Sequence, residues 1–240
     1  MKKIITLLAI LTVSITSAQW GQKKIKGNGN FISKQISTSD YESISVAGTF
    51  YVTLVKGKEG KITIKGEENI LEHIVVESKN DDLQIRTEKG YNLSPSRGKR
   101  IEITVPVEEV EKINLAGSGD IVGDFTLKAA NFKASLAGSG DIKLMIDAQN
   151  TTANVAGSGD IELKGKTENF NANVSGSGDI KAFDLLAQKS KVAVSGSGNI
   201  RTTCSEFIEA RVAGSGDIEY KGKPKKVDTK VAGSGKIKMI

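Results

Sequence analysis

The sequence predicts an all-β fold, a single-stranded parallel β-helix (solenoid) with coils of about 19 residues. Three observations predict it: a short phrase that recurs seven times, apolar residues that alternate with polar ones around it, and two glycines in every copy. In its clearest form the phrase reads Gly-Ser-Gly-Asp/Asn-Ile. The steps between copies are 21, 19, 19, 20, 18 and 19 residues, because the copies begin at Gly117, Gly138, Gly157, Gly176, Gly196, Gly214 and Gly233.

Strands are predicted on both sides of each turn by two columns of apolar residues. The residue that follows the turn is Ile in every copy: Ile121, Ile142, Ile161, Ile180, Ile200, Ile218 and Ile237. The residue two positions before the turn is Leu or Val: Leu115, Leu136, Val155, Val174, Val194, Val212 and Val231. Mostly polar residues lie on either side of these columns, and such period-two alternation is typical of a half-buried strand. Each copy is therefore interpreted as strand, glycine turn, strand.

The turn glycines and the apolar columns together favour a stack of strands. Glycine accepts a positive φ or a close backbone approach, which a tight corner needs. Coils stacked about 4.8 Å apart would bury the columns continuously, at about 1.5 to 3 kcal/mol for each fully buried Ile. A helical solenoid is the competing interpretation of such a period. Two glycines in every copy disfavour helices, and Val and Ile favour strands.

The amino end predicts a secretory signal peptide at residues 1–18. A basic start at residues 1–3 precedes an apolar run at residues 4–15, and small residues follow before a predicted cleavage at Gln19. Its removal takes away Lys2 and Lys3 and no acid, so the formal net charge falls from +6 to +4. No later segment reaches the roughly 20 apolar residues of a membrane helix, so we expect no membrane-spanning segment in the mature chain.

The mature chain is expected to hold a flexible N-terminal segment at residues 19–39 and one β-helical domain at residues 40–240. Within that domain, residues 40–105 predict irregular coils and a cap, and residues 106–240 predict the regular repeats. The segment Glu67–His73 predicts one or two helical turns that cap the stack. A cap is expected because an open β-helix end presents unpaired backbone groups.

The upstream segment Val46–Phe50 is a candidate degenerate copy of the phrase, in which an aromatic residue replaces the second glycine. If it is a true copy, the stack begins well before Gly117. The alternative is that the stack begins only at the first intact phrase.

The longest turn-rich stretch, residues 89–100, holds the candidate ligand contacts. These are Tyr91, Arg97, Lys99 and Arg100. Loops carry much of the binding function of proteins. The alternative interpretation is a solvated connecting loop whose charges face water.

A column of polar residues within the turns predicts a structural ladder: Asp120, Asp141, Asp160, Asp179, Asn199 and Asp217. Asp and Asn hydrogen-bond nearby backbone N–H groups in tight turns, and Asn can replace Asp in that role. Carboxylates at coil spacing are also candidate calcium ligands. Two such charges repel by only about 1 kcal/mol in a water-like dielectric, so no metal is required to hold the column. We therefore expect no cofactor, with calcium as the alternative.

Catalytic and nucleic-acid-binding functions find little support in the residues. His73 is the only histidine, so His-rich metal sites are excluded by count, and a Ser-His-Asp or Cys-His arrangement would have to rest on this one residue in a predicted capping segment. Cys204 is expected to be buried as a small hydrophobe in the same column as Phe125 and Ile146. Basic residues alternate with Glu on the outward positions, which disfavours a nucleic-acid groove. We expect the chain not to be an enzyme.

The phrase at Gly196–Ile200, together with Ser45–Gly48 and Gly66–Leu71, resembles the head GIN domain family, whose members are labelled putative auto-transporter adhesins. The resemblance covers about residues 40–235. It implies a right-handed β-helix and a secreted Bacteroidetes-type protein. Export across the inner membrane would then place the chain in the periplasm, on the outer-membrane surface or outside the cell.

The leading functional hypothesis is a non-enzymatic cell-envelope protein that binds a glycan or another cell-surface molecule. It rests on repetition without a singular cluster of catalytic residues. One alternative is a carbohydrate-active β-helix enzyme that uses the Asp column and the 89–100 loop, with Asp160 and Arg97 as its test positions. Another is a self-assembling structural envelope protein that pairs through residues 237–240. The oligomeric state is left open.

Overall fold

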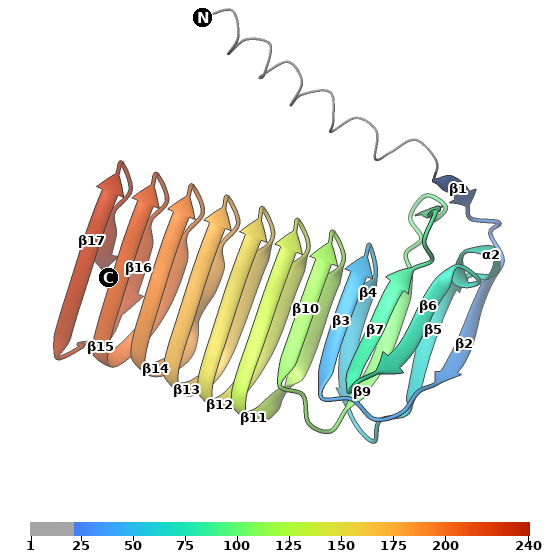
Figure 1. The fold of residues 1–240 in the computed structure, drawn as a ribbon, viewed down its shortest axis with the longest axis horizontal. Coiled ribbons are helices and arrows are strands. Elements are labelled where there is room, and N and C mark those ends of the chain that lie inside the picture. The colour runs from blue at the N-terminus through green and yellow to red at the C-terminus, as the bar shows by residue number, and fades with distance from the viewer. Residues whose placement is uncertain (1–21) are drawn as a thin grey trace, which may run out of the picture.

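A computed structural model describes residues 22–240. The signal peptide predicted at residues 1–18 lies outside the described residues. Within residues 22–240 most residues lie in β-strands, and there is one short helix. The strands form a stack of parallel coils that is closed at its N-terminal end by antiparallel strands (Figure 1). The predicted parallel β-solenoid is confirmed.

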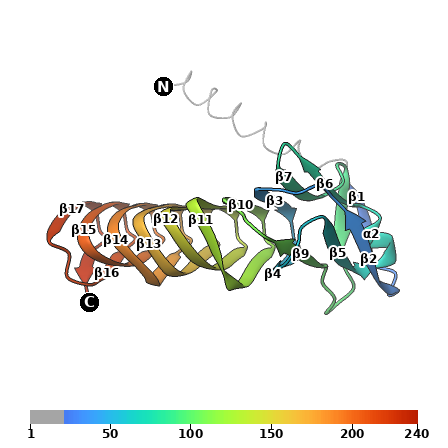
Figure 2. The ribbon, with the colours of Figure 1, turned by 90° about the horizontal axis from the view of Figure 1, so that it is seen from below.

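The regular coils extend from residue 112 to residue 239. Their strands are β10 (Lys112–Gly117), β11 (Asp120–Gly138), β12 (Asp141–Gly157), β13 (Asp160–Gly176), β14 (Ile180–Gly196), β15 (Ile200–Gly214), β16 (Ile218–Lys221), β17 (Lys226–Gly233) and β18 (Ile237–Met239). Each long strand crosses from one face of the solenoid to the other, so the coils enclose a flat interior between two layers (Figure 2). Asp141 pairs with Asp160 and Gly157 pairs with Gly176, which shows that the copies of the phrase stack in register.

Both predicted apolar columns line the interior. The Ile column is fully buried from Ile121 to Ile218, and the Leu/Val column is at most 3% exposed from Leu115 to Val212. Burial of these side chains from coil to coil supplies the main stabilisation of the stack, at about 1.5 to 3 kcal/mol for each residue.

The stack begins upstream of the intact phrases. Strand β3 (Ser43–Gly48) pairs with β10 in parallel, and Gly48 lies opposite Gly117. Strand β4 (Tyr51–Lys56) pairs with the start of β11. The segment Val46–Phe50 is therefore a true copy of the phrase, and the alternative that the stack begins only at the first intact phrase is wrong. Phe50 stands where later copies have the second glycine, and its ring is buried.

After this first coil the chain turns back toward the N-terminal end of the stack. The excursion contains β5 (Lys61–Glu67), α2 (Glu68–Leu71), β6 (Ile74–Lys79), β7 (Asp82–Thr87), β8 (Tyr91–Ser94) and β9 (Glu102–Val107). Strand β7 pairs in parallel with β3 and β9 with β4, which adds a layer behind the first coil. Strands β6 and β5 then pair antiparallel with β7 and β9 and end the parallel stack.

The helix α2 packs within this closing layer. Ile70 and Leu71 of the helix and Ile74 just after it are buried, as predicted for a cap. Among the described residues, no helix is both long enough and apolar enough to cross a membrane.

The prediction of a flexible segment at residues 19–39 is wrong for residues 23–37. Strand β1 (Lys23–Lys26) pairs in parallel with β8, and β2 (Phe31–Ser37) pairs antiparallel with β5. Both strands lie at an edge, where one side faces water and few apolar residues are needed. Ile32 and Ile36 of β2 still pack partly against the core.

Cys204 is buried, as predicted, but in a different column. It lies opposite Ala187 of β14, whereas the spacing predicts the column of Phe125 and Ile146. The register between β14 and β15 shifts between Ala182 and Leu186. After such a bulge, each later residue of the strand lies opposite a different partner from the one expected by counting residues from the turn.

Candidate functional site: the turn ladder and the outer groove

The Asp/Asn column within the turns is hydrogen-bonded from coil to coil. Asp160 Oδ1 accepts the backbone N–H of Asp179 at 3.0 Å, and Asp179 Oδ1 accepts that of Asn199 at 2.8 Å. Asn199 Oδ1 accepts the backbone N–H of Asp217 at 3.0 Å. Asp217 Oδ1 in turn accepts the N–H of Lys236 at 2.7 Å. The same bond joins Asp120 to Asp141 and Asp141 to Asp160, at 3.3 Å each.

This geometry gives the column a structural role without a metal. One oxygen of each side chain already accepts an amide hydrogen, and Asn serves as well as Asp because an amide oxygen accepts the same bond. Lys181 Nζ lies 2.6 Å from Asp160 Oδ2, and this hydrogen bond raises the pKa of Lys181. Within residues 22–240 no three His, Cys, Asp or Glu side chains converge as metal ligands would. The expectation of no cofactor, with calcium as the alternative, stays a prediction.

The stretch at residues 89–100 is not a loop throughout, because residues 91–94 form strand β8, and only the part after β8 is a loop. Three of its four candidate ligand contacts rest on aromatic rings of the protein itself. The Tyr91 ring stacks on His73 with centroids 3.9 Å apart. The guanidinium of Arg100 lies 3.9 Å from the centre of the Tyr51 ring. Lys99 Nζ lies 5.5 Å from the centre of the Phe31 ring.

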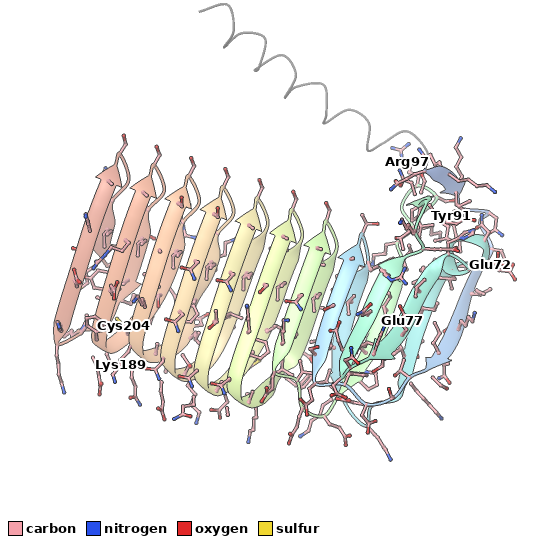
Figure 3. All side chains as sticks on the ribbon, viewed as in Figure 1. Glu72, Glu77, Tyr91, Arg97, Lys189 and Cys204 are labelled. Atoms are coloured by element: carbon pink, nitrogen blue, oxygen red, sulfur yellow. The ribbon has the colours of Figure 1, made fainter. Side chains whose placement is uncertain are left out.

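These contacts tie the loop to the cap and do not gather the four side chains around one site. Arg100 also donates to Glu102 at 3.0 Å. Arg97 is exposed and extends from the cap end of the molecule, near Tyr91 (Figure 3). A cation held over an aromatic ring gains about 0.5 to 1 kcal/mol at an exposed site, so the loop is at least partly a structural element.

A groove on the outside of the solenoid was not singled out from the sequence. It has a volume of about 990 Å³ and extends along the stack over β7, β3 and β10 and the last residues of β11 to β15 and β17. One outward column of its floor is Ala or Ser in every coil: Ala47, Ala116, Ala137, Ala156, Ser175, Ser195, Ala213 and Ala232. The small side chains leave the backbone of the sheet accessible.

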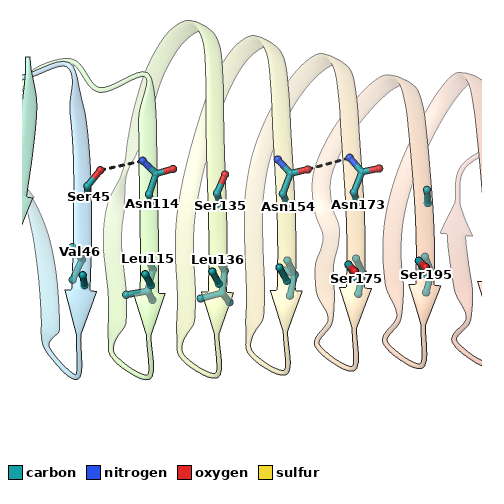
Figure 4. A pocket seen from close by; sticks show the side chains of 18 of the residues that line it. Ser45, Val46, Asn114, Leu115, Ser135, Leu136, Asn154, Asn173, Ser175 and Ser195 are labelled. Atoms are coloured by element: carbon teal, nitrogen blue, oxygen red, sulfur yellow. Dashed lines mark hydrogen bonds between the residues drawn. The ribbon is translucent and has the colours of Figure 1, made fainter. Parts of the chain in front are cut away.

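The neighbouring outward column of the groove is polar and uncharged over most of its length. It contains Ser45, Asn114, Ser135, Asn154, Asn173 and Ala193. Asn114 Nδ2 donates to Ser45 Oγ at 3.1 Å, and Asn173 Nδ2 donates to Asn154 Oδ1 at 3.0 Å (Figure 4). These amides and hydroxyls point out of the sheet in a row that follows the coils.

Basic side chains border both ends of the groove. Arg86 on β7 lies at the cap end and pairs with Glu77 at 3.1 Å. Arg211 lies at the opposite end, where it pairs with Asp228 at 2.6 Å, and Lys230 lies beside it on β17. The groove is therefore a long floor of small residues with hydrogen-bonding groups along it and cations at its ends. A signal for it was present in the sequence, because the position just before each turn is always Ala or Ser, whereas the outward position after the Ile of each turn is Lys, Arg or Glu in every copy from Lys143 to Lys238.

The fold and this face define a class of protein: a parallel β-solenoid that presents a repetitive surface. The chain belongs to the family described as putative auto-transporter adhesin, head GIN domain, whose profile matches residues 40–224. The resemblance seen in the repeated turn is thereby confirmed. A comparison with curated proteins finds no match.

Solved structures of similar fold come from Bacteroides and Parabacteroides species. A putative adhesin from Bacteroides fragilis is 26% identical, with a TM-score of 0.77 over 90% of this chain and 100% of that chain. A putative lipid binding protein from Parabacteroides distasonis is 29% identical, with a TM-score of 0.75 over 91% of this chain and 100% of that chain. A putative adhesin from the same Parabacteroides species is 21% identical with a TM-score of 0.73 over 91% of this chain and 100% of that chain, which shows a shared fold.

Proposed function

We propose that this chain is a non-enzymatic envelope protein, an adhesin-like module that binds an extended partner along the outer groove. The observation that carries the proposal is the uninterrupted column of Ala and Ser from Ala47 to Ala232, beside a row of amides and hydroxyls. A surface that repeats at every coil, about 4.8 Å apart, suits a ligand that is itself extended and repetitive. The adhesin description of the family supports the same role.

A glycan is the first partner we propose. Its hydroxyl and amide groups can pair with Asn114, Ser135, Asn154 and Asn173, and the C–H faces of its sugar rings can lie on the small side chains of the floor. Hydrogen-bond donors and acceptors of this kind orient a ligand and provide specificity.

A lipid is the second candidate, and a separate observation favours it. The floor is lined mainly by apolar atoms of small residues, and cations such as Arg211 and Lys230 at one end suit an anionic headgroup. The similar structure from Parabacteroides distasonis is described as a putative lipid binding protein.

A carbohydrate-active enzyme receives less support from the geometry. Asp160 is engaged by the backbone N–H of Asp179 and by Lys181, within the turn ladder. Arg97 belongs to the loop between β8 and β9 in the cap, whereas Asp160 begins β13, with the coils of β11 and β12 between. A general acid and its partner must both reach one bond of the substrate. The two positions are therefore poor candidates for one catalytic site.

Binding is tested with residues 19–240 on an immobilised glycan panel and on vesicles of zwitterionic and anionic lipids. We expect Ala137→Gln and Ala156→Gln to weaken binding at least about tenfold, because a long uncharged side chain fills the narrow floor without attracting an anionic ligand. Ala130→Gln is the matched control, since Ala130 is an exposed residue of the same strand as Ala137 but lies outside the groove. Equal loss in all three variants, or none in the groove variants, contradicts the proposed site. Failure of the parent to bind either panel, together with unchanged attachment of a deletion strain, contradicts the function.

Exposure of the domain at the cell surface is a separate part of the proposal. An epitope tag inserted next to Arg97, at the tip of the exposed loop, can be followed in intact cells treated with protease. We expect loss of the tag while a periplasmic control protein stays intact. A protected tag would place the partner in the periplasm and contradict adhesion.

A further inference from the structure

The last coil presents an apolar edge with exposed core positions. Among residues 22–240, β17 pairs with β15 alone and β18 pairs with β16 alone, so both strands end the stack (Figure 1). Val231 is 42% exposed, whereas Val212 in the same column is 3% exposed. Val227 is 48% exposed, whereas Ile208 beneath it is fully buried. A strand edge of this kind offers unpaired backbone groups to another strand.

The opposite end of the stack is shaped differently. There β2 pairs antiparallel with β5, β6 pairs antiparallel with β7, and α2 packs nearby, so the parallel coils are closed off. An open edge from another molecule finds no matching parallel coil at this end. Growth from head to tail is therefore disfavoured, and an open edge can best be covered by an identical open edge.

Strand β17 is complementary to itself when two copies pair antiparallel about Thr229. In that register Asp228 of one copy lies opposite Lys230 of the other, and Val227 lies opposite Val231. Val227, Thr229 and Val231 continue the inward columns of β15, while Asp228 and Lys230 continue its outward ones. The apolar pairs would thus extend the core and the charged pairs would lie outside. Opposite charges and β-branched residues are favourable cross-strand neighbours.

We propose that two copies of this chain associate through β17 in this register, as a closed dimer with two-fold symmetry. Opposite residues of an antiparallel pair point to the same side of the sheet, so an inward residue of one copy must lie opposite an inward residue of the other. The two-fold axis must therefore pass through a residue and not between two residues. A centre on Asp228 would place two aspartates opposite each other and Lys226 opposite Lys230, and a centre on Lys230 would oppose two lysines. The centre on Thr229 avoids like-charge pairs and uses Lys226 to Ala232 of each strand. The pairing of identical surfaces closes the assembly at two copies.

The dimer has a consequence for the outer groove. The two-fold axis is perpendicular to the sheet that contains β17, so the outer surface of this sheet faces the same way in both copies. Ala232 and Lys230 line the end of the groove and lie on β17. The two grooves would therefore meet end to end on one face.

The test is the mass of residues 19–240 by sedimentation over a dilution series, with two charge variants. We expect a dimer for the parent. Lys230→Asp and Asp228→Lys should each raise the dissociation constant at least about tenfold, because like charges then oppose each other. An equimolar mixture of the two variants should dimerise again, because each strand then meets its opposite charges. Lys189→Asp, an exposed change on β14 in the middle of the solenoid, is the matched control and should dimerise as the parent does.

The mixture separates loss of the interface from loss of folding. Asp228→Lys also removes the ion pair with Arg211, so circular dichroism must show that each variant stays folded. A misfolded variant would not recover its dimer on mixing. A parent that is monomeric at its highest soluble concentration, a variant Lys230→Asp that dimerises unchanged, or growth into larger species overturns the proposal.

Discussion

Ser96 donates both its backbone N–H and its hydroxyl to the carboxylate of Glu67, at 2.8 and 2.6 Å. The backbone N–H of Gly29 donates to the same carboxylate at 2.7 Å. Glu67 lies at the end of β5 and is 2% exposed, so one buried side chain joins β5, the segment before β2 and the loop after β8. These hydrogen bonds, first of all the one from the Ser96 hydroxyl, hold the pKa of Glu67 below its usual value.

The cap is therefore expected to lose stability in acid. Because the folded-state pKa of Glu67 is below the ordinary value of 4.5, its contribution is complete above that value and is lost as the pH falls through the folded-state pKa. We expect Glu67→Gln to lower the unfolding temperature at neutral pH, and the difference from the parent to shrink in acid. Thermal unfolding of both proteins from pH 7 to about pH 3 measures this.

Glu72→Gln is the control for this prediction, because Glu72 is an exposed residue at the end of α2. This control should unfold as the parent does at neutral pH. A difference between parent and Glu67→Gln that stays constant with pH would contradict a role for the carboxylate charge.

The glycine turns are expected to tolerate no side chain inside the stack. Gly157 has φ +132°, and a Cβ placed on it would lie 2.3 Å from the carbonyl oxygen of Gly138 in the preceding coil. The neighbour is backbone and cannot move aside without breaking the register. We expect Gly157→Ala to cost at least about 3 kcal/mol or to prevent folding.

Gly98→Ala separates backbone strain from crowding. Gly98 has φ +75° but open space around its Cβ position. The Gly98→Ala variant should lose only about 1 to 2 kcal/mol of stability, which is the cost of a left-handed conformation for a residue with a Cβ. The urea midpoint followed by circular dichroism compares the two variants, and equal losses would show that crowding is not the cause.

The repeats were predictable because apolar and polar residues alternate within each copy and the copies recur at a nearly constant spacing. The Ile column and the Gly-Ser-Gly turns needed no knowledge of distant residues. Strands β1, β2 and β8 were not predicted, because they are short or polar edge strands that depend on partners far along the chain. The layering of β7 and β9 behind β3 and β4 likewise depends on a reversal of the chain that no local pattern encodes.

The candidate site was predictable only in part for the same reason. Spacing identified the Asp/Asn column, whose members touch their own equivalents in the next coil. Spacing could not show that Arg100 lies over the Tyr51 ring, or that the Tyr91 ring stacks on His73. These pairs are far apart in the sequence and are brought together by the tertiary structure. The outer groove depends on small residues, which are easily passed over when charged and catalytic types are sought.

The turn ladder is expected to need its hydrogen-bond acceptor and not its charge. Asp160→Asn keeps an oxygen for the N–H of Asp179, whereas Asp160→Ala leaves that group without this acceptor. We expect the Ala variant to lose about 1 kcal/mol more than the Asn variant. Urea unfolding of the two variants measures the difference.

Calcium is tested on the same proteins. With one carboxylate oxygen of Asp160 bonded to an amide and the other to Lys181, the parent should unfold at the same temperature with calcium and with a chelator. A calcium-dependent rise that Asp160→Asn abolishes would overturn this expectation and establish a metal site.

The thiol of Cys204 is expected to be unreactive in the folded protein. The residue is 1% exposed, and burial raises the pKa of the thiol, an effect that a hydrogen bond with Ser190 partly offsets. Only the thiolate reacts readily with alkylating and disulfide reagents, so both protonation and lack of access slow the reaction. Labelling with a thiol reagent at about pH 8 should be slow in buffer and complete in denaturant.

A matched variant shows whether slow labelling comes from the burial of Cys204 itself or would affect any thiol on this coil. Ser205 is the exposed neighbour of Cys204 on β15. In a Cys204→Ala background, Ser205→Cys should be labelled rapidly in buffer. The background change itself should cost about 1 kcal/mol or less, because the column already holds Ala187 in the preceding coil and a small residue fits there. Equally rapid labelling of Cys204 in buffer would contradict its burial and reopen a redox or cross-linking role for this cysteine.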